Sequence, residues 1–404
     1  MTTLTREDGF SLVEVMIATT IMLVVTAATL TTFKNGMDIN DTAGQLADAN
    51  QNLRAGTNQL VRDLMMAGRI IADGAVPVPN GAGALAINRP GPPGSALTFA
   101  LLADDDAAGT IAMPSLTTGY HLGPVINGST TDVVTILTVD EFTQSMQGVA
   151  EGTVPTATQG SINKDGSQVT LLNTSVWLTG DAVNDVSPIG VGDLILFKNN
   201  YGMAIQTVTS TDATHIYFAQ NNANDWFHFN QRGTSLAGTL FCIKSDVACS
   251  TVPVLSSATD PFTPGAVPTM FRLLMLTYYV DNTTTAGTPR LTRVVNHCPG
   301  TDLTPGCDLF PTFGPMALAG VVEDLDLTYD LVDPSMNGAV KQPTLPVTIG
   351  AVTYTSNMIK TVNVHVGVRS EAISKPTQDY VRNHISTAVS VRSLTAVDRY
   401  DLSQ

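Results

Sequence analysis

The sequence predicts an α+β protein, in which a long N-terminal helix packs on a β-rich domain of antiparallel sheet. Two observations predict this. An apolar run near the N-terminus continues into a polar segment whose apolar residues recur every three or four positions, which is the period of a helix. Further along, runs of four to eight β-favouring residues alternate with Gly, Asn and Asp turns, which is typical of antiparallel strands.

Composition agrees with this fold class. The chain has 404 residues, so the part beyond the helix is long enough for one large or two modest domains. Only 14% of the residues are charged, and Thr, Val, Gly, Asn and Ala dominate, which suits strands joined by polar turns. The net charge of -15 argues against a general nucleic-acid surface, which would need a basic footprint. We therefore expect no nucleic-acid partner.

Residues 10–33 form the first predicted element, a membrane-spanning helix. Its length suffices to cross a hydrocarbon core of about 30 Å. Glu14 is the one ionisable side chain in it. A carboxylate inside a bilayer costs on the order of 2.5–3.5 kcal/mol, so Glu14 needs a positively charged partner.

A short motif at the start of this helix carries a family resemblance. Residues 9–14 read Gly-Phe-Ser-Leu-Val-Glu and lead straight into the apolar run. This resembles the class III signal of type IV prepilins and type II secretion pseudopilins. In that family a membrane peptidase cuts after the glycine and methylates the new amine, which the glutamate of a neighbouring subunit neutralises. The resemblance implies cleavage between Gly9 and Phe10, N-methylation of Phe10, and an assembly carboxylate at Glu14.

The alternative is an ordinary membrane anchor with a chance glutamate. Residues 1–9 would form the prepilin leader, but they contain Glu7 and Asp8 beside Arg6, whereas such leaders are more often plainly basic. An ordinary secretory signal is not indicated, because no basic flank and small-residue cleavage site bracket the apolar run.

Residues 34–70 are predicted as the amphipathic half of the same helix. A single helix from Phe10 to about Ala67 would be roughly 85 Å long. Gly36 and Gly44 are tolerable interruptions, and two helices hinged at Gly36 are the alternative. Residues 52–68 resemble the helix end of PilW-type minor pilins and J-type minor pseudopilins, and Gly68 is a plausible stop.

Residues 71–165 are predicted as a linker and variable insertion. The first part is rich in Gly, Pro, Ala and Asn, which indicates a loop. The run Asp104, Asp105 and Asp106 would be a solvated turn or, alternatively, a site for a hard cation. The adjacent carboxylates cannot all converge from one strand, which favours the turn.

Residues 166–404 are predicted as the β-rich head. Its strands are expected at residues 169–172, 192–197, 203–208, 215–218, 271–280, 289–295, 321–329, 359–370 and 382–392, and one further strand is expected inside the preceding insertion, at residues 132–139. Several of these resemble PilW-type strands in family order. In residues 225–229, alternation would place Trp226 and His228 on one face and Phe227 and Phe229 on the other. Core packing is the expectation for this cluster, and an exposed patch for a partner pilin is the alternative.

Four cysteines form two close pairs. For a domain outside the cytoplasmic membrane, disulfides are the natural interpretation, and we favour the local pairing Cys242–Cys249 and Cys298–Cys307. Zinc is the rival because His297 adjoins Cys298, but the spacings match no CxxC pair. No metal site is therefore predicted.

No catalytic residue or cofactor is predicted. The chain has no GxSxG elbow, P-loop or HExxH motif. Asp324 and Asp326 would share one strand face, and Glu323 adjoins them. A hydrolase, however, would also need an aromatic groove for its sugar. We therefore expect a structural protein rather than an enzyme.

The resemblance implies a minor pilin or pseudopilin that primes or caps assembly of a type IV pilus-like filament or type II secretion pseudopilus. Implied partners are prepilin peptidase, other minor and major pilins or pseudopilins, and the inner membrane. The chain would be a single-pass membrane protein before assembly and part of an extracytoplasmic filament afterwards. Alternatives are a filament-tip adhesin, a membrane-anchored extracytoplasmic enzyme, or a DNA-uptake subunit with a local basic stripe at Arg290 and Arg293.

Overall fold

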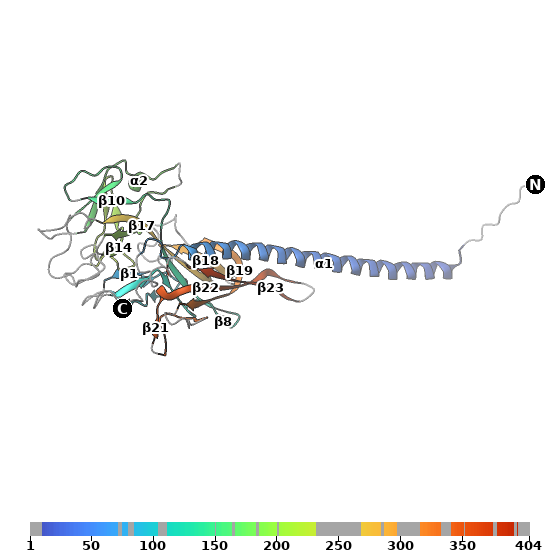
Figure 1. Ribbon diagram of the computed structural model, residues 1–404. Coiled ribbons are helices and arrows are strands. Elements are labelled where there is room, and N and C mark those ends of the chain that lie inside the picture. Colours follow the sequence, from blue (N-terminus) through green and yellow to red (C-terminus); the bar gives the residue numbers. More distant parts are fainter. Residues whose placement is uncertain are drawn as a thin grey trace, which may run out of the picture.

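The computed structural model describes most of the chain. The residues it describes are 10–71, 75–79, 85–103, 111–149, 151–163, 166–182, 186–199, 202–231, 268–283, 287–296, 316–332, 341–350, 352–374, 378–391 and 394. Figure 1 shows a long helix that leaves a β-rich head at one end. The predicted α+β class is confirmed.

Helix α1 runs unbroken from Leu12 to Met65. It passes through Gly36 and Gly44 without a break, so the alternative of two hinged helices is wrong. The helix ends just before Gly68, which adopts a positive φ of 76° that favours glycine. The helical period read from the sequence therefore predicts this element to within two residues at each end.

Only the second half of α1 packs on the head. Ala49, Leu53, Leu60 and Leu64 are buried, and their spacing puts them on one helical face. They join a core with the inner faces of strands β19 (Met316–Leu331), β22 (Ile359–Ser374) and β23 (Asp379–Ser390). Along β22, buried and partly exposed residues alternate, as expected for a strand with one covered face.

One 14-stranded sheet forms most of the head. Its remaining members are β6 (Leu116–Thr117), β9 (Val134–Val139), β10 (Met146–Val149), β11 (Gln159–Ile162), β12 (Gln168–Leu171), β13 (Leu194–Lys198), β14 (Met203–Thr207), β15 (Ser210–Thr211), β16 (His215–Tyr217), β17 (Thr269–Asp281) and β18 (Arg290–Val295). Among the described strands, only β10 and β11 pair in parallel. Each strand predicted from the sequence overlaps one of these strands.

Strand β17 is the centre of the sheet. It pairs with β10 and β13 near its start, and with β9 and β18 towards its end. Strand β9 lies within residues 71–165 and pairs with β17 from Leu273 to Tyr278. Strand β17 contributes side chains to three hydrophobic cores: the core that faces α1 and two further cores. Its first residues lie in the part of the head away from α1 (Figure 1).

Small elements complete the described head. They are β1 (Ala75–Val78), β2 (Asn88–Arg89), β3 (Leu97–Thr98), β4 (Leu102–Ala103), β5 (Ile111–Pro114), β7 (Val125–Ile126), β8 (Ser129–Thr130), β20 (Val347–Ile349), β21 (Val352–Tyr354), α2 (Val176–Thr179) and the 3₁₀ turn Ser356–Met358. The aromatic cluster at 225–229 lies in a turn rather than a strand. Phe227 and Phe229 are buried and stacked, while Trp226 and His228 are only partly buried. The cluster therefore packs in the core.

Candidate assembly segment and an adjoining groove

The first half of α1 is an unpartnered apolar helix. All residues from Phe10 to Met37 are exposed; Leu23, for example, is 70% exposed and Phe33 66%. The helix is long and apolar enough to cross a membrane, and its most apolar window has no contact with the head. Apolar side chains around a whole helix require a lipid or protein environment. This half of α1 is therefore the candidate anchor and assembly segment.

Glu14 lies at the start of this segment in a capping box. The Ser11 N–H donates to Glu14 Oε2 at 2.9 Å, and the Glu14 N–H donates to Ser11 Oγ at 3.2 Å. The pair satisfies two of the backbone donors that a helix start leaves free. Ser11 is extended (ψ 148°) and helical geometry starts at Leu12. The helix thus begins just after Phe10, which is itself 87% exposed.

Several predicted features lie outside the described residues. These are Gly9, the three-aspartate run at 104–106, His297 and all four cysteines. Cleavage at Gly9 and the two disulfides therefore stay predictions. Among the described residues, no group of three or more His, Cys, Asp and Glu side chains could hold a metal ion.

Asp63 fixes the other end of α1 to the head, a role that no pattern in the sequence indicates. Its side chain is 1% exposed and accepts from Arg293 Nε at 2.7 Å, Tyr278 Oη at 2.5 Å and Gln59 Nε2 at 3.1 Å. Burial lowers the pKa of Arg293, but the charges of Asp63 and Tyr278 and the hydrogen bonds with both side chains together outweigh burial and raise that pKa. Arg293 is therefore held as a cation inside the head, and it forms no basic stripe with the exposed Arg290.

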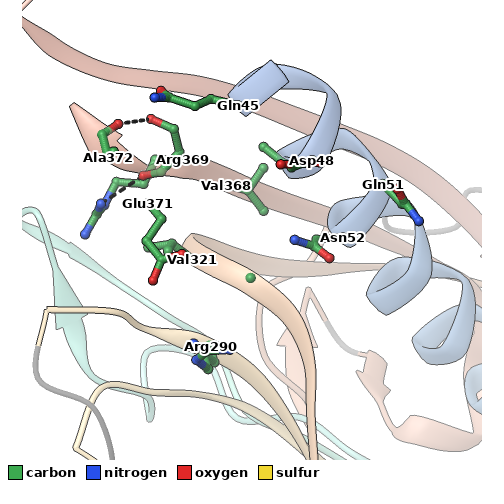
Figure 2. A pocket seen from close by; sticks show the side chains of 13 residues that line it. Gln45, Asp48, Gln51, Asn52, Arg290, Val321, Val368, Arg369, Glu371 and Ala372 are labelled. Atoms are coloured by element: carbon green, nitrogen blue, oxygen red, sulfur yellow. Dashed lines mark hydrogen bonds between the residues drawn. The ribbon is translucent and has the colours of Figure 1, made fainter. Parts of the chain in front are cut away.

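A groove of about 640 Å³ opens where α1 leaves the head. Figure 2 shows Gln45, Asp48 and Asn52 of α1 on one side, Glu371 reaching in from β22, and Arg290 across from Gln45. The floor is made of small and apolar residues, among them Ala49, Gly320, Val321 and Val368.

Arg369, in the wall of this groove, is held in place by its own chain. Its Nε lies 2.9 Å from Glu323 Oε1, and its guanidinium donates to the Gly287 carbonyl at 2.7 Å. The guanidinium carbon also lies 3.8 Å from the centre of the Tyr380 ring, which is a cation–π contact. Arg369 is therefore held against Glu323, the Gly287 carbonyl and the Tyr380 ring.

The outer face of the sheet holds a Ser–His–Asp row that sequence reasoning missed. Ser386 Oγ lies 2.8 Å from His365 Nδ1, and His365 Nε2 lies 3.6 Å from Asp324 Oδ2. His384 is close, with its ring centre 5.4 Å from that of His365. Burial, followed by repulsion from Asp326, raises the pKa of Asp324. Strand pairing alone brings these residues together from three strands.

This row lacks the surroundings that acyl-transfer catalysis needs. Ser386 and His384 are exposed on an open sheet face. The backbone N–H groups of β19, β22 and β23 lie in the plane of the sheet, whereas the row lies on its face, so they are not aimed at a developing oxyanion. The geometry gives no reason to assign hydrolysis to these residues or to the Asp324 and Asp326 carboxylates.

Comparison with known proteins agrees with the assembly segment. Residues 4–30 match the family model described as the prokaryotic N-terminal methylation motif. Searches of curated proteins and of solved structures give no match. The motif and the exposed apolar helix support a protein of the type IV pilin-like or pseudopilin class, made as a membrane-anchored precursor. A pilin-type motif indicates a structural protein that a prepilin peptidase processes and that assembles with other pilins.

Proposed function

We propose that the chain is a minor subunit that primes or caps assembly of a type IV pilus-like filament or type II secretion pseudopilus. The observation that carries the proposal is the two-part helix α1. Its first half carries the methylation motif and is exposed, apolar and interrupted by a single carboxylate. Its second half packs on a large β-rich head and is bonded to it through Asp63 and Arg293. Such a chain leaves its anchor half free to bundle with other helices while the head stays outside the bundle.

Glu14 and Phe10 carry the assembly chemistry in this proposal. Cleavage after Gly9 frees the amine of Phe10, which is then N-methylated. The Glu14 carboxylate pairs with that amine on an adjacent subunit inside the bundle. Opposite charges attract far more strongly in a low-dielectric core than in water. Because an unpaired charge there is costly, the pair also fixes the register of the two helices.

Intact mass and N-terminal sequencing of the full chain from its own membranes test the proposal. The wild type is expected to begin with N-methyl-Phe10, and Gly9→Ala is expected to keep its leader. Glu14→Ala is expected to be cleaved but missing from the filament fraction. A wild-type chain that begins at Met1, or one cut at another bond, would overturn the proposal.

A further inference from the structure

Strand β23 lies at the end of the main sheet and pairs on one side only. It is paired with β22, and no other described strand pairs with it. The Val391 N–H donates to the Lys360 carbonyl, and the register with β22 runs without a shift from Arg382 to Ser390. Because hydrogen bonding alternates along an antiparallel strand, the odd-numbered residues bond to β22. The even-numbered residues from 382 to 390 therefore direct their N–H and C=O groups to the open edge.

This edge lacks the features that usually protect one. Residues 383–390 contain no Asp, Glu, Lys, Arg, Pro or Gly, and the even-numbered ones are all exposed. Native sheets commonly protect a long edge strand with charges, proline or a bulge. The His384 N–H, one of the open-edge donors, is bonded at 2.9 Å by the side chain of its own neighbour, Asn383. Within the described chain, the edge therefore presents backbone donors and acceptors to which no strand is paired.

The core beneath α1 is also incompletely covered at this edge. Ile385 of β23 and Val61 of α1 pack against the core but are only partly buried. Asn50 of α1 is bonded to Asn383 of β23, and Val61 lies eleven residues further on, on the same side of the helix. A strand added to β23 would cover this margin with the apolar side chains that it carries at every second position.

We propose that the open edge of β23 receives an extended strand from a different subunit of the same filament. The inference rests on the proposed function, because a subunit that primes or caps a filament has unlike chains as its neighbours. Main-chain hydrogen bonds along residues 382–390 would hold the strand, and its alternating side chains would decide which subunit fits. The fitting strand has apolar residues on the side of α1 and small or polar residues on the other side. Because β23 packs along α1, the helix bundle brings a neighbouring subunit to this edge.

Two other occupants fit the edge less well. Helix α1 and β23 run in the same direction: the Thr42 hydroxyl lies 3.1 Å from that of Ser374, before the strand, and Leu394, after it, lies beside Gly68. Two copies joined edge to edge in an antiparallel pair would therefore point their anchors in opposite directions, which one membrane cannot accommodate. The chain's own residues 395–404 contain three charged residues within four positions, which is a poor match for an uncharged edge.

Residue-resolved hydrogen exchange tests the pairing directly. The full chain is compared as a monomer in detergent and in sheared filaments. The odd-numbered amides of residues 382–390 are expected to exchange slowly in both, whereas the even-numbered amides exchange fast in the monomer and at least about tenfold more slowly in filaments. Processed chain in filaments whose even-numbered amides still exchange fast overturns the inference. Slow exchange in the monomer would identify residues 395–404 as the occupant, and slowing with the concentration of purified chain would identify a second copy, so either result also overturns it.

A proline at the open edge provides a second test. Ser386→Pro removes one open-edge N–H and keeps the pairing with β22, because an edge strand tolerates proline on its free side. It is expected to lower the amount of chain recovered in filaments roughly tenfold, with the free energy of unfolding unchanged. Ser386→Ala, which removes the same hydroxyl but keeps the N–H, is the matched control and should be recovered in full. Ala388→Pro repeats the test at the next open-edge position.

The two proposals fail in different ways. Equal recovery of Ser386→Pro and Ser386→Ala in filaments, with both chains cleaved, overturns the strand pairing alone and leaves the proposed function standing. A wild-type chain that stays uncleaved and confined to membranes overturns the proposed function, and the strand pairing with it.

Discussion

At the scale of single residues, Asp63 shows how a buried charge can position a helix. It lies in the last turn of α1, where the helix dipole disfavours a negative charge. Arg293 and Tyr278 compensate by donating to the same carboxylate oxygen, Oδ2. The three side chains come from α1, β18 and β17, so the pairing of β17 with β18 and the docking of α1 depend on one another.

The Asp63→Asn variant is expected to lower the free energy of unfolding by about 3 kcal/mol, because it leaves Arg293 partly buried without a counter-charge. Denaturant titration of the full chain in detergent measures this loss. Asp41→Asn, on the exposed part of the same helix, should change it by less than about 0.5 kcal/mol. Equal effects of the two variants would mean that the buried ion pair does not stabilise the head.

Three buried tyrosines predict a loss of stability in alkali. Burial raises the pKa of Tyr278, Tyr279 and Tyr329, with nearby carboxylates adding to the effect. Their hydroxyls keep the proton in the folded state, whereas in the unfolded chain they lose it near about pH 10. The contribution of the three protonated hydroxyls to the stability of the folded state is therefore complete below about pH 10 and is lost as the pH rises further.

Unfolding free energies at about pH 9 and about pH 11 check this expectation. Tyr279→Phe removes one of the three titrating hydroxyls and should make the alkaline loss smaller. An unchanged loss would show that the tyrosines are not its source.

Sequence reasoning reaches some of these residues and not others. Glu14 stands out because it is a lone carboxylate in an apolar run, and this pattern can be recognised from the neighbouring residues in the sequence alone. Asp63 and Arg293 are 230 positions apart, and nothing local marks them as partners. The same is true of the Ser386, His365 and Asp324 row, which exists only once the register of three strands is set.

At the scale of elements, the packing of α1 on β19 depends on a small residue. A Cβ added to Gly56 would lie 2.8 Å from the Cβ of Ala319, whereas one added to Gly44 meets nothing within 4 Å. Helix α1 and strand β19 therefore approach closely at this point, because only a glycine at position 56 leaves room for the Ala319 side chain. The apolar spacing that predicts α1 also predicts its buried face, but only the structure shows which glycine sits at the contact.

These two glycines give opposite predictions for the same substitution. Gly56→Ala is expected to destabilise the head by about 1–3 kcal/mol through overpacking. Gly44→Ala should stabilise the helix by up to about 1 kcal/mol, because alanine has less chain entropy to lose. Hydrogen exchange along α1 and denaturant titration distinguish the two. Stabilisation by both substitutions would contradict the close contact with Ala319.

At the scale of the whole molecule, the anchor and the head are separable. Residues 10–37 are exposed throughout and bury nothing on the head. The β-favouring runs of the sequence predict ten of the fourteen strands of the main sheet, because each of these runs shows a pattern of its own between turn residues. The order of the strands in the sheet is not readable in this way, since the central strand β17 gathers partners from distant parts of the chain.

Removal of residues 1–33 is expected to give a soluble, monomeric head. Its free energy of unfolding should match that of the full chain within about 0.5 kcal/mol, because no core contact is lost. Analytical ultracentrifugation and denaturant titration measure the two properties. An aggregated product, or one that unfolds much more easily, would show that the exposed half of α1 supports the head.

The way α1 lies along β22 and β23 has a mechanical consequence. In the proposed filament, tension would pull on the anchor end of α1 while the head resists, so the load would be directed along the helix axis. The apolar contacts from Ala49 to Leu64 and the Asp63 ion pair are spread along that axis. They are loaded in shear and must yield together, whereas a helix pulled away sideways would peel off one turn at a time. The head should therefore withstand axial force better than its thermal stability alone suggests.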